Sequence, residues 1–340
     1  MHISPSLCNL PKELALSIFN EVGFKSIQNL RKVCHDLRNR IDDIKPEANL
    51  LSVFIRVTDC GIRFVYYSKL RTLDVEESED AVEYEKTEES GRSIVKHDLL
   101  EKIVNGDYME LASRDLQLIL KFQKQRIRSI TFNNRNEHSS HFLQFLETFK
   151  SLLAFENRLL NVAHFNINAI DQKSVITALS LIDPQSICRM TLADWDGSIR
   201  PMEFPEIMEM EHWKTAKHFK SDFLITGVSA HNFRHFSRVE LKFQSISAEE
   251  LLEWIKIFQN STKSNMFQIR CDTFVDREQF FEKMGLANFQ NSSEADVFSI
   301  RYDTFEGKEQ FFETMEPTTP DPSHSITCCM QEFRLKRPRV

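Results

Sequence analysis

The chain has 340 residues, and 50 acidic against 43 basic side chains give it a formal net charge of −7. This balance argues against a nucleic-acid coat, because neutralising phosphates requires clustered Lys and Arg. Only 8 residues are Gly, which argues against an enzyme that binds phosphate groups with Gly-rich loops. The 28 Phe residues predict a core built on aromatic side chains. Seven scattered Cys without a C-x-x-C pair favour a reducing compartment over a disulfide or zinc framework.

The sequence shows no basic-then-apolar leader and no apolar run near the roughly 18 residues that span a bilayer. We therefore expect a soluble intracellular protein, in the cytoplasm, the nucleus or both, with no membrane or nucleic-acid partner. The basic residues at 334–339 fit a nuclear import signal or, more commonly, a solvated terminus.

The first fifty residues predict three short helices. Leu10-Pro11 opens the first, since Pro loses no hydrogen bond at the first helical position. Gly23 provides a stop, Ser26 an N-cap for the second helix, and Pro46 an end for the third. The apolar positions at helical spacing are Leu14, Ile18, Phe19 and Val22 in the first helix, Ile27, Leu30, Val33, Cys34 and Leu37 in the second, and Ile41 and Ile44 in the third.

These helices are too short to bury all of that apolar surface among themselves. Some of their faces could fill a groove on a partner, as amphipathic helices do. The same faces could pack on the C-terminal part of the chain instead. From the residues alone, binding to a partner and packing on the rest of the chain are about equally favoured.

The string LPKELALSIFNEV followed by SIQNLRKVCHDLRNRID resembles an F-box, in which Leu-Pro opens the first helix and Val-Cys-x-x-Leu-Arg lies in the second. In that family the motif binds the small Skp adaptor, which connects to a cullin scaffold carrying the ubiquitin-transfer machinery. The chain departs from the family pattern in the short connection at residues 23–25 and in having no Trp after Val33-Cys34. The resemblance implies an adaptor-binding surface and its support at Leu10, Pro11, Leu14, Ile18, Phe19, Leu30, Val33, Cys34 and Leu37.

Residues 51–90 have a different character. The runs LSVFIRVT, IRFVYY and LRTLDV are rich in Val, Ile, Phe and Tyr and are separated by turn residues, which predicts an antiparallel ribbon. From Asp74 to Glu89 acidic residues dominate. This predicts a solvated strand edge or loop, with a docking site for a basic partner as the less favoured interpretation.

From about residue 97, strand-like and helix-like periods alternate, which predicts a parallel sheet with helices on its outer side. Residues 239–258 form the clearest unit, a strand and a helix with Ser247 and Glu250 as a capping box and Trp254 in the core.

Residues 267–284 and 298–315 form a duplication with 12 of 18 positions identical. The pattern of each copy predicts a strand, a turn and a short helix bearing Phe-Phe. Such a unit cannot bury its own apolar face, so adjacent copies should stack into a curved, leucine-rich-repeat-like solenoid. A local duplication without functional meaning predicts the same stacking.

The strings EHWKTAK at residues 211–217 and HNFRHFSRVELKF at residues 231–243 resemble the FTH domain of the nematode-expanded F-box A family. The resemblance implies an F-box followed by an FTH domain that holds a protein substrate. The predicted fold class is α/β, with an all-α F-box, a small β-ribbon and a leucine-rich-repeat-like solenoid with a parallel sheet. The predicted domains are the F-box at 1–48, a β-rich acidic connector at 49–96, the FTH-like repeats at 97–316 and a flexible, Pro-containing basic tail at 317–340.

Chemistry-bearing motifs are missing from the sequence. The sequence contains no G-x-S-x-G, G-x-x-x-x-G-K-[ST] or G-x-G-x-x-G motif. The strand–helix alternation is therefore the one feature that suggests an α/β enzyme. His231 and His235 are four apart but have no evident third ligand, so we expect no metal and no cofactor. Trp195, at a strand-to-turn junction, is a candidate for substrate binding, although burial in the core is commoner for Trp.

The predicted function is that of a non-catalytic substrate receptor of a Skp–cullin–F-box ubiquitin ligase. Its partners would be a Skp-type adaptor, a cullin reached through that adaptor, and an unknown protein substrate. The alternative is a scaffold or sequestering protein that uses the same helices and never joins a cullin complex.

Overall fold

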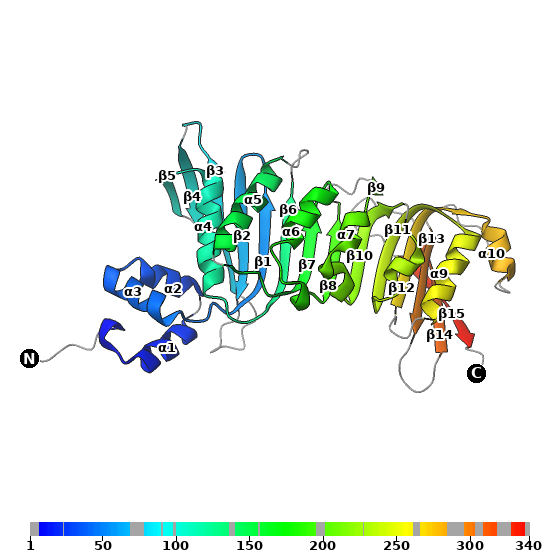
Figure 1. Cartoon of the computed structure of the whole chain (residues 1–340), viewed down its shortest axis with the longest axis horizontal. Coiled ribbons are helices and arrows are strands. Elements are labelled where there is room, and N and C mark those ends of the chain that lie inside the picture. Colours follow the sequence, from blue (N-terminus) through cyan, green and yellow to red (C-terminus); the bar gives the residue numbers. More distant parts are fainter. Residues whose placement is uncertain are drawn as a thin grey trace, which may run out of the picture. The chain divides into compact units, whose positions relative to one another are not determined.

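The computed structural model describes residues 7–22, 24–68, 78–89, 91–97, 100–135, 140–155, 157–194, 201–226, 228–260, 266–283, 296–302, 309–317 and 328–336. The chain divides into two compact units, Met1–Ile187 and Cys188–Val340 (Figure 1). No helix within the described ranges is both long enough and apolar enough to cross a membrane.

Three short helices open the first unit, as predicted. They are α1 (Lys12–Glu21), α2 (Phe24–Arg31) and α3 (His35–Ile44), after a 3-10 turn at Leu7–Asn9. Their boundaries differ from the prediction. Pro11 precedes the first helical residue, and α2 begins at Phe24 rather than after Ser26. Gly23 lies outside the described residues.

The predicted second helix is too long. It ends at Arg31, and Val33 and Cys34 lie in the connection to α3. Cys34 has extended backbone and N-caps α3, where its Sγ accepts a hydrogen bond from the Leu37 N–H at 3.5 Å. The apolar repeat of the sequence therefore runs across a corner between two helices. Periodicity alone predicts one continuous helix there, but the hydrogen bond of the Cys34 side chain to the backbone starts a new helix instead.

Seven strands of the described residues form the sheet of the first unit, in the order β7-β6-β1-β2-β3-β4-β5. They are β1 (Leu50–Val57), β2 (Gly61–Ser68), β3 (Ser78–Lys86), β4 (Arg92–His97), β5 (Leu100–Asn105), β6 (Ile127–Asn134) and β7 (Val162–Asn168). β1, β6 and β7 are parallel. From β1 to β5 the pairing is antiparallel, which confirms the first two strands of the predicted ribbon.

The acidic stretch is not a strand edge. Its described part, from residue 78, forms β3, which pairs with β2 on one side and β4 on the other. The strand tolerates its charges because cross-strand partners neutralise them: Lys96 Nζ lies 2.5 Å from Glu85 Oε2. Residues 74–77 lie outside the described ranges, as does the whole of the predicted strand LRTLDV.

One face of this sheet carries helices α4 (Tyr108–Lys121), α5 (Ser140–Phe155) and α6 (Gln172–Leu179) (Figure 1). Alternation along each strand sends every second side chain toward them. In β1 these are Val53, Ile55 and Val57, which are at most 1% exposed. Phe64 of β2 meets Phe145 of α5, with ring centroids 6.2 Å apart.

The second unit contains strands β8 (Arg189–Ala193), β9 (Pro201–Met202), β10 (His218–Ile225), β11 (Arg238–Ser247), β12 (Met266–Val275), β13 (Asp296–Tyr302), β14 (Glu309–Pro317) and β15 (Cys328–Lys336). Its described helices are α7 (Pro205–Glu209), α8 (Glu211–Thr215), α9 (Ala248–Asn260) and α10 (Arg277–Lys283). β8, β10, β11 and β12 are parallel, as predicted, but β12 to β15 are antiparallel. The uniform parallel solenoid is therefore not formed.

The duplicated segments adopt different structures. The first copy is a strand and a helix, β12 and α10, as predicted. In the second copy the segment that repeats the helix is strand β14, paired with both β13 and β15. β15 also corrects the prediction of a flexible tail over residues 328–336. A neighbouring strand that offers backbone hydrogen bonds can override the intrinsic preference of a short segment, and here β15 is that neighbour.

Aromatic side chains build the core of the second unit, as the Phe content predicts. Trp213 contacts Phe219, Phe233 and Phe236 with ring centroids 4.7–5.2 Å apart. Trp254 is 5% exposed, which confirms its predicted place in the core. The Ser247–Glu250 capping box is also present, with hydrogen bonds of 2.8 and 3.2 Å.

Helix α5 offers a matched test of this core. Phe145 is fully buried and Phe155 is 92% exposed on the same helix. We expect Phe145→Ala to lower the free energy of unfolding by about 3–5 kcal/mol, because it removes buried apolar surface and leaves a cavity. Phe155→Ala should change it by less than about 0.5 kcal/mol. Urea unfolding followed by circular dichroism measures both, and equal effects would contradict the described packing.

Candidate functional site

Helix α1 presents an apolar stripe to solvent. Leu14 is 55% exposed and Ile18 is 38% exposed. With exposed Pro11 they follow the i, i+3, i+7 spacing of one helix face. Ala15 and Phe19 occupy another face and are fully buried. The helix is therefore anchored by one apolar face while a second apolar face stays uncovered.

A second exposed apolar side chain lies at the corner between α2 and α3. Val33 is 70% exposed there, next to exposed Cys34. Leu30, before the corner, is half-buried, and Leu37, after it, is 4% exposed.

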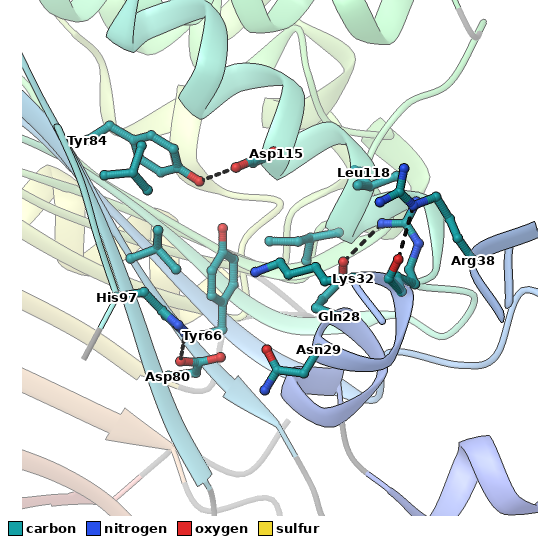
Figure 2. A pocket seen from close by; sticks show the side chains of 14 residues that line it. Gln28, Asn29, Lys32, Arg38, Tyr66, Asp80, Tyr84, His97, Asp115 and Leu118 are labelled. Atoms are coloured by element: carbon teal, nitrogen blue, oxygen red, sulfur yellow. Dashed lines mark hydrogen bonds and ion pairs between the residues drawn. The ribbon is translucent and has the colours of Figure 1, made fainter. Parts of the chain in front are cut away.

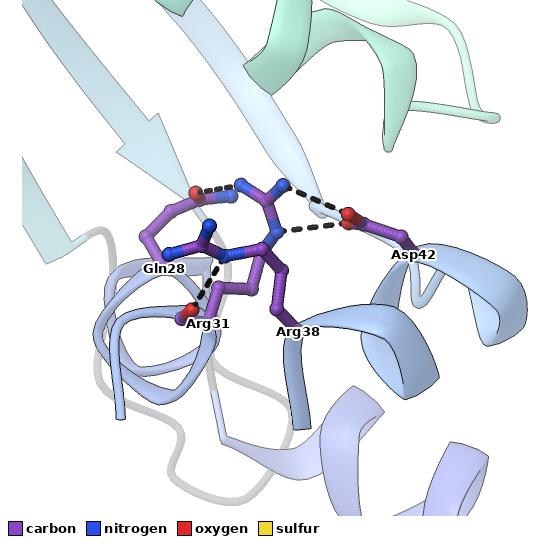
Figure 3. Close-up of polar contacts among 4 residues, drawn as sticks. All are labelled: Gln28, Arg31, Arg38 and Asp42. Carbon is purple, nitrogen blue, oxygen red and sulfur yellow. Dashed lines mark hydrogen bonds and ion pairs between the residues drawn. The ribbon is translucent and has the colours of Figure 1, made fainter. Parts of the chain in front are cut away.

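An ion pair fixes this corner (Figure 3). Arg31 donates from Nε and Nη2 to the two carboxylate oxygens of Asp42 at 2.9 and 3.1 Å, and from Nη1 to Gln28 Oε1 at 3.1 Å. Arg38 Nε donates to the Arg31 carbonyl at 3.0 Å. The Arg31 guanidinium also lies over the Phe122 ring, 5.6 Å from its centroid, so it links the helices to the residue that follows α4.

Buried polar groups join the three helices to the sheet. The Glu47 carboxylate accepts hydrogen bonds from the Lys124 and Gln125 N–H groups at 2.9 and 3.4 Å. The Glu47 N–H donates to Asn20 Oδ1 of α1 at 3.1 Å. The Gln123 amide accepts from the Leu50 N–H at 2.9 Å and donates to the Leu50 carbonyl at 3.2 Å. The start of β1 is thus tied to the loop after α4.

The positions predicted for the adaptor surface fall into three groups. Pro11, Leu14, Ile18, Val33 and Cys34 are exposed. Leu10 and Leu30 are half-buried, and the Leu10 carbonyl accepts a hydrogen bond from Arg40 Nη2. Phe19 and Leu37 are buried and support the others from within. Trp195, the candidate for substrate binding, lies outside the described residues.

A cleft of about 400 Å³ lies beside α2 (Figure 2). Gln28 and Asn29 of α2 and Lys32, just after it, line one side. Across from them, His97 Nε2 lies 2.9 Å from Asp80 Oδ1, and the Tyr84 hydroxyl donates to Asp115 Oδ2 at 2.6 Å.

The two tyrosines of the cleft keep their protons. Burial raises the pKa of Tyr66 well above its usual value, and the nearby carboxylates of Asp115 and Asp80 add to this. Burial is also the main cause that raises the pKa of Tyr84, followed by Asp115. Neither phenol can therefore serve as a base near neutral pH.

Sequence reasoning found the apolar stripe but missed the corner ion pair and the cleft. Arg31 and Asp42 are eleven positions apart on two helices, so no periodicity relates them. The cleft joins residues from α2, β2, β3, β4 and α4, whose pairing no single segment predicts. Of the two histidines considered for metal binding, His235 Nε2 lies 2.8 Å from the Trp213 carbonyl oxygen. Within the described ranges, no group of three or more His, Cys, Asp or Glu is placed to hold a metal.

Comparison with known proteins identifies two domains. The F-box domain family matches residues 7–48, and the FTH domain family matches residues 143–285. F-box A protein 224 of Caenorhabditis elegans is 22% identical over 260 residues, which make up 73% of this chain and 62% of that protein. The chain thus matches less than two thirds of this relative's length. No solved structure matches the chain.

The corner ion pair generates a prediction. In a double-mutant cycle of Arg31→Met and Asp42→Asn, we expect a coupling free energy of about 1 kcal/mol, because the Arg31 side chain is only 13% exposed and binds through two hydrogen bonds. The matched control is Arg92 with Glu89, a pair whose side chains are 52% and 71% exposed. Its coupling should be about 0–0.5 kcal/mol. Unfolding by urea measures both cycles, and similar coupling in the two would show that Arg31 does not fix the corner.

Proposed function

We propose, from the premise that this chain carries an F-box domain followed by an FTH domain, that it is a substrate-recognition subunit of a Skp–cullin–F-box ubiquitin ligase. The F-box would bind a Skp-type adaptor and, through it, a cullin. The FTH domain would bind a protein target. F-box proteins are typically non-catalytic receptors, and this chain would be one of them.

The observation that carries the proposal is the uncovered stripe of α1. Leu14 and Ile18 are large apolar side chains left 55% and 38% exposed, although Ala15 and Phe19 already anchor the helix. An apolar helix face that the fold does not use is suited to a hydrophobic groove on a partner. The F-box match covers the residues of this stripe, which supports the proposal.

The burial pattern assigns roles to the predicted adaptor residues. Pro11, Leu14, Ile18 and Val33 would contact the adaptor, since they are exposed. Phe19 and Leu37 would hold the contacting helices in place from the interior. Leu10, Leu30 and Cys34 would lie at the margin of the adaptor contact. Each of them would also help to hold the three helices together.

In this function the chain contributes proximity rather than chemistry. Other subunits would carry the activated ubiquitin, and the receptor would raise the effective concentration of a target lysine beside it. The alternative function, a scaffold or sequestering protein, would use the same helices without joining a cullin complex. Binding to the adaptor distinguishes the two.

We expect the double substitution Leu14→Ala, Ile18→Ala to weaken binding of a purified Skp adaptor by roughly 1000-fold, because two anchors at about 2 kcal/mol each are lost. Both side chains are exposed, so folding should be preserved, which circular dichroism checks. Titration calorimetry with the full chain gives the affinities.

The control is Leu159→Ala, Val275→Ala, which truncates side chains of similar exposure (51% and 43%) elsewhere in the chain. It should bind the adaptor as the unchanged chain does. If the unchanged, folded chain does not bind, the receptor function is wrong and the scaffold alternative takes its place.

A further inference from the structure

The sheet of the first unit has a second face, opposite the helices. Side chains there alternate with the buried ones, so in β1 they are Ser52, Phe54 and Arg56. All three are half-buried rather than covered. Helices α4, α5 and α6 lie on the other face, where the apolar side chains are (Figure 1).

A polar row crosses this open face where the parallel strands end. Arg56 of β1 pairs with Asn133 of β6, which pairs with Asn168 of β7. On its other side Arg56 pairs directly with Arg63 of β2. Arg135 follows β6, and its N–H donates to the Val57 carbonyl at 3.0 Å. We call Arg56, Arg63 and Arg135 the arginine cluster. The carboxyl ends of parallel strands are where open α/β sheets place their ligands.

The arginine cluster is positively charged and makes no direct ion pair with a described carboxylate. Among the described residues, no carboxylate lies within 4.0 Å of any of its three guanidinium groups. Glu83 pairs with Arg63 in register, but Glu85, the next carboxylate on that face of β3, is taken by Lys96. Burial, then Arg135 and Arg63, lower the pKa of Arg56, and Glu83 opposes them only in part.

Arg56 is held in place but not satisfied. Its guanidinium lies over the Phe54 ring, 5.5 Å from the centroid. Its Nε is buried and has no hydrogen-bond partner, and the same is true of Oδ1 of the neighbouring Asn133. Two like charges directly opposite each other on adjacent strands and an unpaired buried donor both disfavour the fold. A ligand that accepts hydrogen bonds and carries negative charge would offset both.

We propose that the arginine cluster is a docking site for an oxyanion, a carboxylate or a phosphate, carried by an acidic segment of a partner protein. Guanidinium groups match the planar carboxylate and the phosphate through paired hydrogen bonds. The amides of Asn133 and Asn168 extend the row with further polar groups. The three arginines and Asn133 lie between the two matched segments, whereas Asn168 falls within the FTH match.

A compact anion on a protein fits better than nucleic acid. The same face carries Glu83 and Glu85 on β3, beside the cluster, and Glu101 on β5, and the whole chain has a net charge of −7. A polyanion crossing this face would meet those carboxylates, whereas a single acidic group at the carboxyl ends of the strands would not. The site goes beyond the proposed function and does not depend on adaptor binding.

Binding of three fluorescent ten-residue peptides to the full chain tests the proposal. One is a neutral Gly/Ser peptide, one carries three glutamates, and one carries three phosphoserines. We expect at least one acidic peptide to bind about tenfold or more tightly than the neutral one, and the double substitution Arg56→Gln, Arg63→Gln to abolish that preference. Binding of the phosphoserine peptide alone assigns phosphate as the ligand; binding of the glutamate peptide assigns carboxylate.

The control variant, Arg114→Gln with Arg128→Gln, removes the same two charges from exposed positions, one on α4 and one at the other end of β6. It should bind like the unchanged chain. The proposal is overturned if the acidic peptides bind no better than the neutral one, if both variants lose binding equally, or if a single-stranded oligonucleotide binds more tightly than either peptide.

A second measurement, of thermal unfolding, does not require the variant to bind a peptide or to be as stable as the unchanged chain. Inorganic phosphate should raise the melting temperature of the unchanged chain more than chloride does at equal ionic strength. Phosphate also stabilises proteins in general by its exclusion from their surface, so the Arg56→Gln, Arg63→Gln variant should keep that part of the difference and show a clearly smaller rise than the unchanged chain. An equal response of the two proteins to phosphate would overturn the site.

Discussion

The parallel pairing of β1 with β6 is the constraint on which the first unit depends. It sets Val53, Ile55 and Val57 beneath the helices and turns Phe54 and Arg56 to the opposite face. Because side chains alternate with a period of two, a slip of one residue would exchange these faces and bury Arg56. β1 is also the strand at which parallel pairing changes to antiparallel, so the ribbon β2–β5 inherits its register.

The two ends of β1 then hold the two sites. At its start, Glu47 and Gln123 tie the strand to the loop after α4, and helices α1 to α3 precede this junction directly. At its end lie Arg56 and Val57, beside the polar row. If the proposed function holds, adaptor binding at one end and docking of an acidic segment at the other would need a defined relation, since proximity is what a receptor contributes. A single strand with hydrogen-bonded neighbours on both sides provides a rigid connection of that kind.

Local patterns in the sequence predicted local structure well. The strands β1 and β2, the Ser247–Glu250 capping box and the burial of Trp254 all depend on contacts within a few residues or on strong periodicity. The failures depend on competition between distant parts. Nothing in the duplicated segments tells that one becomes helix α10 and the other strand β14, since the difference lies in the neighbour β15. Likewise the Cys34 cap and the Arg31–Asp42 pair, which form the corner, are invisible to periodicity.

Two arginines of the first unit show how a structural charge differs from a functional one. Arg31 and Arg56 each lie over a phenylalanine ring, at 5.6 and 5.5 Å from its centroid. Arg31 also meets the Asp42 carboxylate and Gln28, so its charge is satisfied within the fold. Arg56 has the ring but faces Arg63 and Arg135 instead of a carboxylate. The fold therefore holds the Arg56 guanidinium in place without a carboxylate partner. This arrangement lowers the stability of the fold, and the packing of the sheet does not require it. A residue that lowers stability without a structural reason, as Arg56 does, is expected to lie at a functional site.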